Sequence, residues 1–223
     1  MATFHPVVSF DPAIDTLVLM DFTAANTSLT PVILNNTTLF TNYIQQVLQT
    51  AGATYGIGGD NEHRTIYSRS EVFNDATEPR RLHLGIDIWG KEGTPVYAPL
   101  DGTIHSFAFN DHYGDYGATI ILQHTQQDPA FHTLYGHLSL QDLEGLYEGK
   151  TVQKGEVLGH FGGPTENGHW PPHLHFQLIT NMEGWKGDYP GVCKFSEREK
   201  YLDNCPNPDH ILQMMRYVSK YLI

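Results

Sequence analysis

The sequence predicts a mainly β protein, an antiparallel sandwich or barrel with a helical extension at each end. Short apolar segments separated by Gly, Pro, Asn and Asp follow one another from about residue 64, and no long amphipathic segment lies between them. Apolar residues recur at helical spacing near the two ends. We therefore expect an N-terminal extension over residues 1–60, a β domain over 61–190 and a C-terminal helical tail over 191–223 that packs on the core.

The N-terminal extension contains one predicted amphipathic helix over residues 37–52. Its apolar residues recur three and four positions apart, and a glycine follows them as a natural stop. These residues are Leu39, Phe40, Tyr43, Ile44, Val47, Leu48 and Gly52. The next segment, YGIGGDN, matches no complete phosphate-binding pattern and predicts a flexible glycine-rich connector.

Seven segments of the β domain have the composition of strands, because β-branched and aromatic residues are bounded by turn residues. They are RLHLGIDIW, TPVYAP, GTIHSFAF, ATIILQH, FHTLYGHL, EVLGHFG and HLHFQLI. The chain closes with NPDHILQMMRYVSKYLI, which predicts a helix capped by Asn207 with Pro208 in its first turn. The apolar stripe of that helix would consist of Ile211, Leu212, Met215, Val218 and Leu222.

Charge and hydropathy argue against two classes of main partner. The 223 residues carry 13 Lys and Arg against 25 Asp and Glu, a formal charge of −12, which argues against nucleic acid and anionic membranes. No stretch approaches the roughly 18 consecutive apolar residues of a membrane span. The N-terminus lacks a basic region followed by an apolar run. We expect a cytoplasmic protein, or a periplasmic or extracellular one if a leader precedes the given sequence.

Cysteine and histidine usage narrows the chemistry. Cys193 and Cys205 form no C-x-x-C pair and are too few for a disulfide scaffold, so free thiols are expected. The chain has 13 histidines, a number that motivates a search for metal ligands.

Two histidines lie one residue apart in PPHLHFQLI, residues 171–179. Side chains two positions apart in a strand share a face, so His173 and His175 point the same way and the apolar residues beside them point the other way. Two imidazoles on one face of a buried strand need partners, because an unpaired buried polar group is costly. Hydrogen-bonded histidines in a cleft, a metal site and a catalytic pair all meet that requirement.

Two further histidines lie in strand-like segments. As one strand, RLHLGIDIW places His83, Gly85 and Asp87 on one face, and Gly85 leaves open space where a side chain would block a ligand. Histidine and aspartate are suitable zinc donors, and three protein ligands leave a fourth position for water. A surface strand with its polar residues outward is the alternative interpretation. FHTLYGHLSL adds His137, which alone would be a cleft or edge histidine.

Taken in order, these segments resemble the lysostaphin/LytM-type zinc metallopeptidases. The matching stretches are HLGID, GTPVYAPLDGTIHSF, YGATIILQH, TLYGHLS, GKTVQKGEVLGHFG and PPHLHFQL, within about residues 64–180. The resemblance implies a compact antiparallel barrel-sandwich-like core of the duplicated hybrid motif type. The chain departs from the family pattern in the bulky loop GGPTENGHWPP and in Gln177, which stands where a glutamate is usual.

Residue by residue, the resemblance implies a metal site and a catalytic pair. His83, Asp87 and His175 would bind one zinc ion per chain, and His137 and His173 would be catalytic histidines outside the ligand set. Either catalytic histidine could deprotonate water, donate to the developing oxyanion or pass a proton to the leaving amine. We interpret Tyr67, ahead of the first ligand, as a core or loop tyrosine or as an oxyanion donor.

The function implied by the resemblance is that of a zinc metalloendopeptidase, with peptidoglycan peptides as the family-typical substrate. One alternative is a non-catalytic binding or regulatory module on the same fold. Another is a peptidase-like enzyme with an intracellular substrate, because the run from YGIGGDNEHRTIY to GDYPGV resembles a segment of some multidomain proteins with kinase-like and aminotransferase regions. A lipoyl- or biotin-type carrier is disfavoured, since VQKGEVLG lacks the lysine turn such carriers need. The sequence leaves the oligomeric state open.

Overall fold

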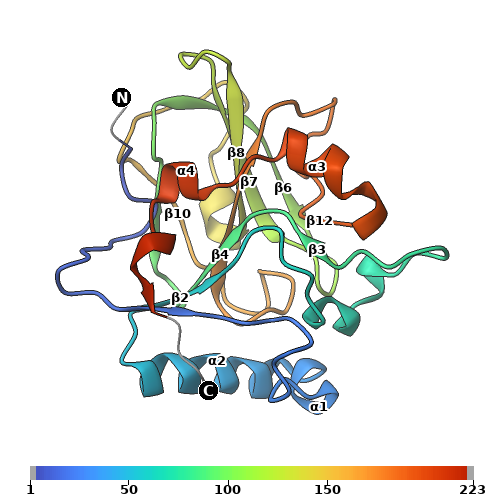
Figure 1. The fold of residues 1–223 in the computed structure, drawn as a ribbon. Coiled ribbons are helices and arrows are strands. Elements are labelled where there is room, and N and C mark those ends of the chain that lie inside the picture. The colour runs from blue at the N-terminus through green and yellow to red at the C-terminus, as the bar shows by residue number, and fades with distance from the viewer. Residues whose placement is uncertain (1–3, 220–223) are drawn as a thin grey trace.

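A computed structural model describes residues 4–219 and places nine strands in one large sheet (Figure 1). The order across this sheet is β13-β1-β2-β4-β11-β8-β7-β6-β9, and two smaller sheets pair β10 with β5 and β12 with β3. The strands are β1 (Leu17–Leu19), β2 (Tyr55–Gly58), β3 (Leu82–His83), β4 (Ile86–Trp89), β5 (Pro95–Tyr97), β6 (Gly102–Asn110), β7 (Gly117–His124), β8 (Phe131–Leu138), β9 (Thr151–Val152), β10 (Val157–His160), β11 (His173–Ile179), β12 (Val192–Cys193) and β13 (Val218–Ser219).

The predicted mainly β class is confirmed, with two differences in detail. Strand β1 runs parallel to both β2 and β13, so the large sheet is mixed, although its other pairs are antiparallel. Over residues 4–219 the sheet ends at β13 on one side and β9 on the other, so it is open and does not close into a barrel.

The helices are short apart from one. They are α1 (Pro31–Leu34), α2 (Thr37–Ala51), α3 (Arg198–Asn204) and α4 (Asp209–Leu212), with 3₁₀ turns at Ile66–Arg69, Glu71–Phe73, Leu140–Leu143, Phe195–Glu197 and Met215–Tyr217. Within residues 4–219, every helix is too short or too polar to cross a membrane.

Helix α2 confirms the prediction for residues 37–52. The side chain of Asn36 accepts a hydrogen bond from the Leu39 amide at 3.0 Å, and Gly52 ends the helix in the left-handed region with φ 59°. Phe40 and Ile44 form its buried face. In Figure 1 the helix lies along the lower side of the molecule, next to β2.

The sequence predicts a flexible connector for the segment YGIGGDN, and this prediction is wrong. Its first four residues are the buried strand β2, which lies between β1 and β4. Gly56 and Gly58 fit there because a Cβ atom on either would come within 2.7 Å of a neighbouring side chain. The glycines therefore serve close packing rather than flexibility. The strand also joins residues of the predicted N-terminal extension to the main sheet, while the predicted three-part division of the chain stays a prediction.

The closing helix predicted over residues 207–223 is wrong beyond Leu212. The carboxylate of Asp209 accepts hydrogen bonds from the amides of Met214 and Met215 at 2.8 and 3.0 Å, and these amides would otherwise continue the helix. Gln213 ends α4 in the left-handed region, and the chain then pairs with β1 as β13. Leu222, the last residue of the predicted apolar stripe, lies outside the described residues.

The core covers one face of the central strand β11, as its alternation predicts. Leu174, Phe176 and Leu178 belong to the largest hydrophobic cluster, together with Tyr135 of β8 and Ile211 of α4. The opposite face of β11 is therefore the one that is available for chemistry.

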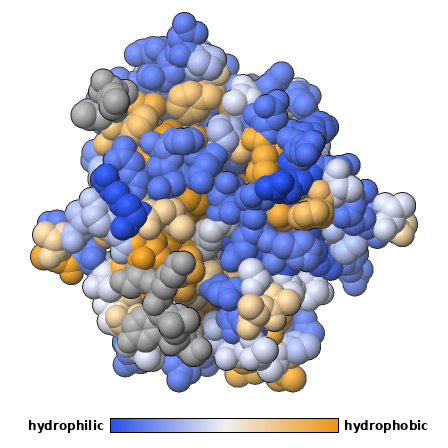
Figure 2. Space-filling model, viewed as in Figure 1, coloured by the Kyte–Doolittle hydropathy of each residue, from blue (hydrophilic) through white to orange (hydrophobic). Residues whose placement is uncertain are grey.

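The outer face of the molecule seen in Figure 2 is mostly hydrophilic, with hydrophobic residues in separate groups.

Candidate metal centre and cleft

Three side chains converge on one point beside the central strands of the large sheet. His83 Nε2 lies 3.0 Å from His175 Nδ1 and 3.2 Å from Asp87 Oδ1, and the remaining pair, His175 Nδ1 and Asp87 Oδ1, is 3.0 Å apart. All three residues are buried. Bonds of about 2.0–2.1 Å to a tetrahedral zinc ion give donor separations of about 3.3–3.4 Å, so this triangle fits one face of such a site.

Hydrogen bonds to the far ring nitrogens determine the tautomers of the two histidines. His83 Nδ1 faces the carbonyl oxygen of Gly59 at 2.9 Å, so this nitrogen carries the proton and Nε2 does not. His175 Nε2 faces the side-chain oxygen of Gln177 at 2.9 Å. The side-chain amide of Gln177 is itself oriented, because its own Nε2 donates to the carbonyl oxygen of Pro190. His175 Nδ1 is therefore also free of a proton.

Two unprotonated imidazole nitrogens and a carboxylate oxygen at this spacing repel one another unless a cation lies between them. Burial lowers the pKa of His83 to about 4, which keeps its imidazole neutral. Burial opposes the charged form of Asp87, but the neighbouring Arg64 guanidinium favours it, and the pKa of Asp87 lies well below its usual range. The donor set therefore fits a divalent metal, and its nitrogen and oxygen atoms suit zinc.

A break in the chain brings His83 and Asp87 together. The predicted single strand RLHLGIDIW is two strands in different sheets, β3 and β4, separated at Gly85 with φ 146°. In one continuous strand, Cα atoms four positions apart would be separated by about 13 Å, too far for both side chains to bind one ion. Asp87 pairs in register with His175 on β11, which supplies the third donor.

His137 and His173 form a second pair beside this triangle. Their rings stack with centroids 4.1 Å apart, and the ring of His173 also stacks on Trp89 at 3.9 Å. His137 has φ 65°, at a bulge between β7 and β8, and this unusual backbone conformation turns its imidazole into the site. His173 shares a face of β11 with His175, as the alternation predicts, so the structure brings all five predicted site residues together.

Both rings of this second pair present Nε2 as a proton acceptor. His137 Nδ1 donates to the carbonyl oxygen of Asn167, and His173 Nδ1 donates to that of Pro171, each at 2.8 Å. Burial lowers the pKa of His173 to about 4, and burial together with the neighbouring His173 and His175 holds the pKa of His137 well below its usual value. At neutral pH both imidazoles are therefore neutral and able to accept a proton.

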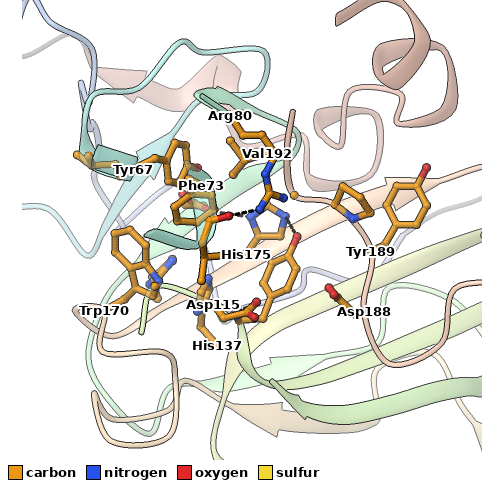
Figure 3. A pocket seen from close by; sticks show the side chains of 18 of the residues that line it. Tyr67, Phe73, Arg80, Asp115, His137, Trp170, His175, Asp188, Tyr189 and Val192 are labelled. Carbon is orange, nitrogen blue, oxygen red and sulfur yellow. Dashed lines mark hydrogen bonds and ion pairs between the residues drawn. The ribbon is translucent and has the colours of Figure 1, made fainter. Parts of the chain in front are cut away.

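A cavity of about 240 Å³ lies against these residues and is lined by Asp87 and by the three histidines His137, His173 and His175. Figure 3 shows His175 in its middle, with Trp170 on one side and Tyr189 on the other. The predicted bulky loop GGPTENGHWPP supplies Trp170, whose ring packs against His173 at a centroid distance of 6.3 Å.

Residues 81–186 match the sequence profile of Peptidase family M23. This part of the chain, slightly less than half of it, is similar to that family. The predicted resemblance to the lysostaphin/LytM-type peptidases is thereby confirmed, and the match includes all five predicted site residues.

Two curated relatives and one solved structure illustrate the likeness. The DD-carboxypeptidase/endopeptidase Mpg of Neisseria meningitidis serogroup B is 35% identical over 130 residues, which cover 56% of this chain and 27% of the relative. The L-Ala--D-Glu endopeptidase of Bacillus subtilis is 30% identical over 148 residues, covering 62% and 43%. The lysostaphin catalytic domain from Staphylococcus simulans aligns over 78% of this chain and 97% of its own, with 22% identity and a TM-score of 0.46. The chain thus spans less than half the length of these two relatives.

The candidate site includes residues that the sequence analysis missed. Arg64 donates to Asp87, the Gly59 carbonyl holds His83, and Asn167 holds His137. Gln177 was noted only as a departure from the family pattern. Its position two residues after His175, on the same face of β11, is the signal that could have identified it as a partner of that histidine.

The two cysteines, Cys193 and Cys205, are free, as predicted, and both are buried. Burial raises the pKa of each thiol to about 12, which keeps both protonated and unreactive as nucleophiles. Cys205 lies beside the site, because its sulfur accepts a hydrogen bond from Gln177 Nε2 at 3.2 Å.

Replacing both cysteines is therefore expected to leave the metal content and the hydrolytic rate essentially unchanged. The Cys193→Ala/Cys205→Ala variant removes both thiols without adding a polar group to the core. Metal analysis and a rate assay test this expectation, and thiol titration should detect two reactive groups only after unfolding. Abolished hydrolysis in a folded, metal-loaded variant would contradict it.

Proposed function

We propose that this domain is a zinc-dependent endopeptidase that hydrolyses short peptides of the peptidoglycan type. The observation that carries the proposal is the convergence of three proton-free donor atoms, 3.0–3.2 Å apart, beside a cavity that two further imidazoles line. Three protein donors with an open side are typical of catalytic zinc sites, whereas structural zinc sites use four. A non-catalytic module would not need this complete set together with the catalytic pair.

The residues of the chain would divide the chemistry between them. A zinc ion held by His83, Asp87 and His175 would polarise the scissile carbonyl and lower the pKa of water. His137 Nε2 and His173 Nε2 face the same cavity and, being neutral, either can take the proton of the attacking water. The protonated imidazole can then donate to the nitrogen of the leaving amine, which completes the exchange of one proton.

Tyr67 would act on the carbonyl oxygen of the substrate. It lines the cavity, and its hydroxyl oxygen accepts a hydrogen bond from Arg64 Nη1 at 3.3 Å, so the hydroxyl proton is available for a substrate. A donor that meets the developing negative charge stabilises the transition state more than the ground state. These contacts support the oxyanion-donor interpretation of Tyr67, which also belongs to a buried hydrophobic cluster.

The names of the relatives support a peptidoglycan-type substrate. They include a DD-carboxypeptidase/endopeptidase, an L-Ala--D-Glu endopeptidase and, in Vibrio cholerae, a peptidoglycan DD-endopeptidase.

Digestion of purified peptidoglycan and of a peptide library, followed by mass spectrometry, tests the proposal. We expect new amine and carboxyl termini at one class of peptide bond in the peptidoglycan. Cleavage confined to library peptides unrelated to the wall would favour the intracellular-substrate alternative, for which the predicted cytoplasmic location would be appropriate.

The metal itself is the subject of a separate prediction. Protein purified without added metal is expected to contain about one zinc ion per chain, because only one His/Asp/His group with suitable spacing occurs among residues 4–219. Elemental analysis measures this content, and a strong chelator should abolish hydrolysis until zinc is restored. A content far below one equivalent, with no uptake on titration, would contradict a zinc site.

A further inference from the structure

Arg64 is a fully buried cation in contact with the candidate metal centre. Its side chain is 0% exposed, and its Nη1 donates to Asp87 Oδ2 at 2.5 Å. Asp87 thus has its two oxygens in different roles, since Oδ1 faces His83 and His175 while Oδ2 faces the guanidinium. We propose that Arg64 is a positioning residue, which holds Asp87 so that a single carboxylate oxygen is presented to the metal.

Four protein groups hold the guanidinium in place. Besides Asp87, its Nε donates to Glu62 at 2.7 Å, its Nη2 to the carbonyl of Gly59 at 3.0 Å and its Nη1 to the Tyr67 hydroxyl at 3.3 Å. A planar guanidinium bound on three sides has one orientation, and it transmits that orientation to its carboxylate partner. The Gly59 carbonyl also accepts from His83, so the same backbone group orients a second metal ligand.

The space for Arg64 is provided by a neighbouring strand. Gly58 on β2 pairs with Asp87 on β4, and a Cβ atom at Gly58 would lie 2.7 Å from Arg64 Nη2. A Cβ atom at the adjacent Gly59 would meet nothing within 4 Å. Both the arginine and the glycines lie outside residues 81–186, so this support comes from the part of the chain that precedes the family match.

The charges explain why an arginine is tolerated beside a cation. Asp87 and Glu62 are both in ion pairs with Arg64. Burial opposes the charged form of Arg64, but Tyr67, Asp87 and Glu62 together raise its pKa. Glu62 offsets the charge of Arg64, so the carboxylate of Asp87 remains available to a divalent ion. Without Arg64, Asp87 Oδ2 would be an uncompensated buried oxygen, free to rotate toward the metal and bind it through both oxygens.

This inference rests on the metal site of the proposed function and is tested by metal binding rather than by hydrolysis. Arg64→Met removes the hydrogen bonds at similar side-chain volume, and Arg64→Lys keeps the charge but not the fork of donors. Zinc affinity, measured by competition with a chromophoric chelator, is expected to fall about 10–100-fold in Arg64→Met and less in Arg64→Lys. Cobalt-substituted protein should show weaker visible bands in Arg64→Met, as expected when Asp87 adds a second oxygen to the ion.

A pair of glycine variants provides a matched test without removing a polar group. Gly58→Ala should push the guanidinium out of position and reproduce the Arg64→Met cobalt spectrum. Gly145→Ala, where a Cβ atom would meet nothing within 4 Å, should keep the wild-type affinity and spectrum. Circular dichroism checks folding, and Glu62→Gln/Arg64→Met is the substitute if Arg64→Met alone does not fold. Unchanged or tighter zinc binding with an unchanged cobalt spectrum in a folded variant would overturn the role of Arg64 alone. A wild-type protein that binds no zinc would overturn the metal centre as well.

Discussion

His175→Ala is expected to abolish zinc binding and hydrolysis, whereas His173→Ala should retain about one zinc ion and lose rate by about 10²–10⁴-fold. The two residues share one face of β11, but their imidazoles carry the proton on different ring nitrogens. His175 uses Nδ1 toward the donor triangle, because Gln177 occupies its Nε2. His173 has Nδ1 bound to the carbonyl of Pro171 and stacks against His137, so its Nε2 is available to substrate or water instead. Losing one of three donors removes the site, whereas losing a neighbouring proton acceptor leaves it intact.

Elemental analysis and steady-state rates of the two variants measure this difference. His132→Ala is a useful control, because His132 is a buried histidine on β8 that packs against His105, with ring centroids 5.0 Å apart, rather than lining the cavity. It should keep both the zinc and the rate. Equal loss of zinc in His173→Ala and His175→Ala, or full activity in His173→Ala, would show that the division of roles is wrong.

Gly85→Ala is expected to weaken zinc binding by about 100-fold or more, although it removes no ligand. This loss is at or beyond the upper end of the range for substitutions beside a metal site. A Cβ atom at this position would lie 2.7 Å from His175 Cε1 and 2.9 Å from its Nε2, and 3.0 Å from the backbone oxygen of Phe176. The backbone oxygen cannot move without disturbing β11, so the imidazole must leave its place. The φ of 146° adds strain, because residues with a side chain rarely adopt it.

Gly145→Ala is the matched control for that experiment. Gly145 also has a positive φ, 71°, but a Cβ atom there would meet nothing within 4 Å. This variant should lose about 1–2 kcal/mol of stability from backbone strain and keep its zinc affinity. Chelator competition and thermal unfolding of both variants separate strain from displacement of the ligand. Wild-type zinc affinity in a folded Gly85→Ala protein would contradict the expectation.

Local patterns predicted the elements whose burial repeats with a simple period. The alternation in HLHFQLI predicted which residues of β11 face the core, and the spacing in TTLFTNYIQQVLQTAG predicted α2 with its stop at Gly52. The same reasoning failed for YGIG and for the closing helix. In the first case, glycines that allow close packing were interpreted as flexibility. In the second, an apolar spacing compatible with a helix was overridden by the Asp209 carboxylate, which binds the amides of Met214 and Met215.

The sequence by itself determined the chemical types in the site, because histidine and aspartate donors and the resemblance of their motifs are readable along the chain. Only the tertiary structure decided how they meet. His83 and Asp87 approach within 3.2 Å because the backbone breaks at Gly85, and His175 joins them because β11 pairs with β4. Arg64 reaches Asp87 from the run YGIGGDNEHRTIY, in which no residue pattern indicates that contact, through the space left by Gly58. Periodicity reports which face of an element is buried, but contacts between distant residues depend on strand order and on single backbone turns, which no local pattern encodes.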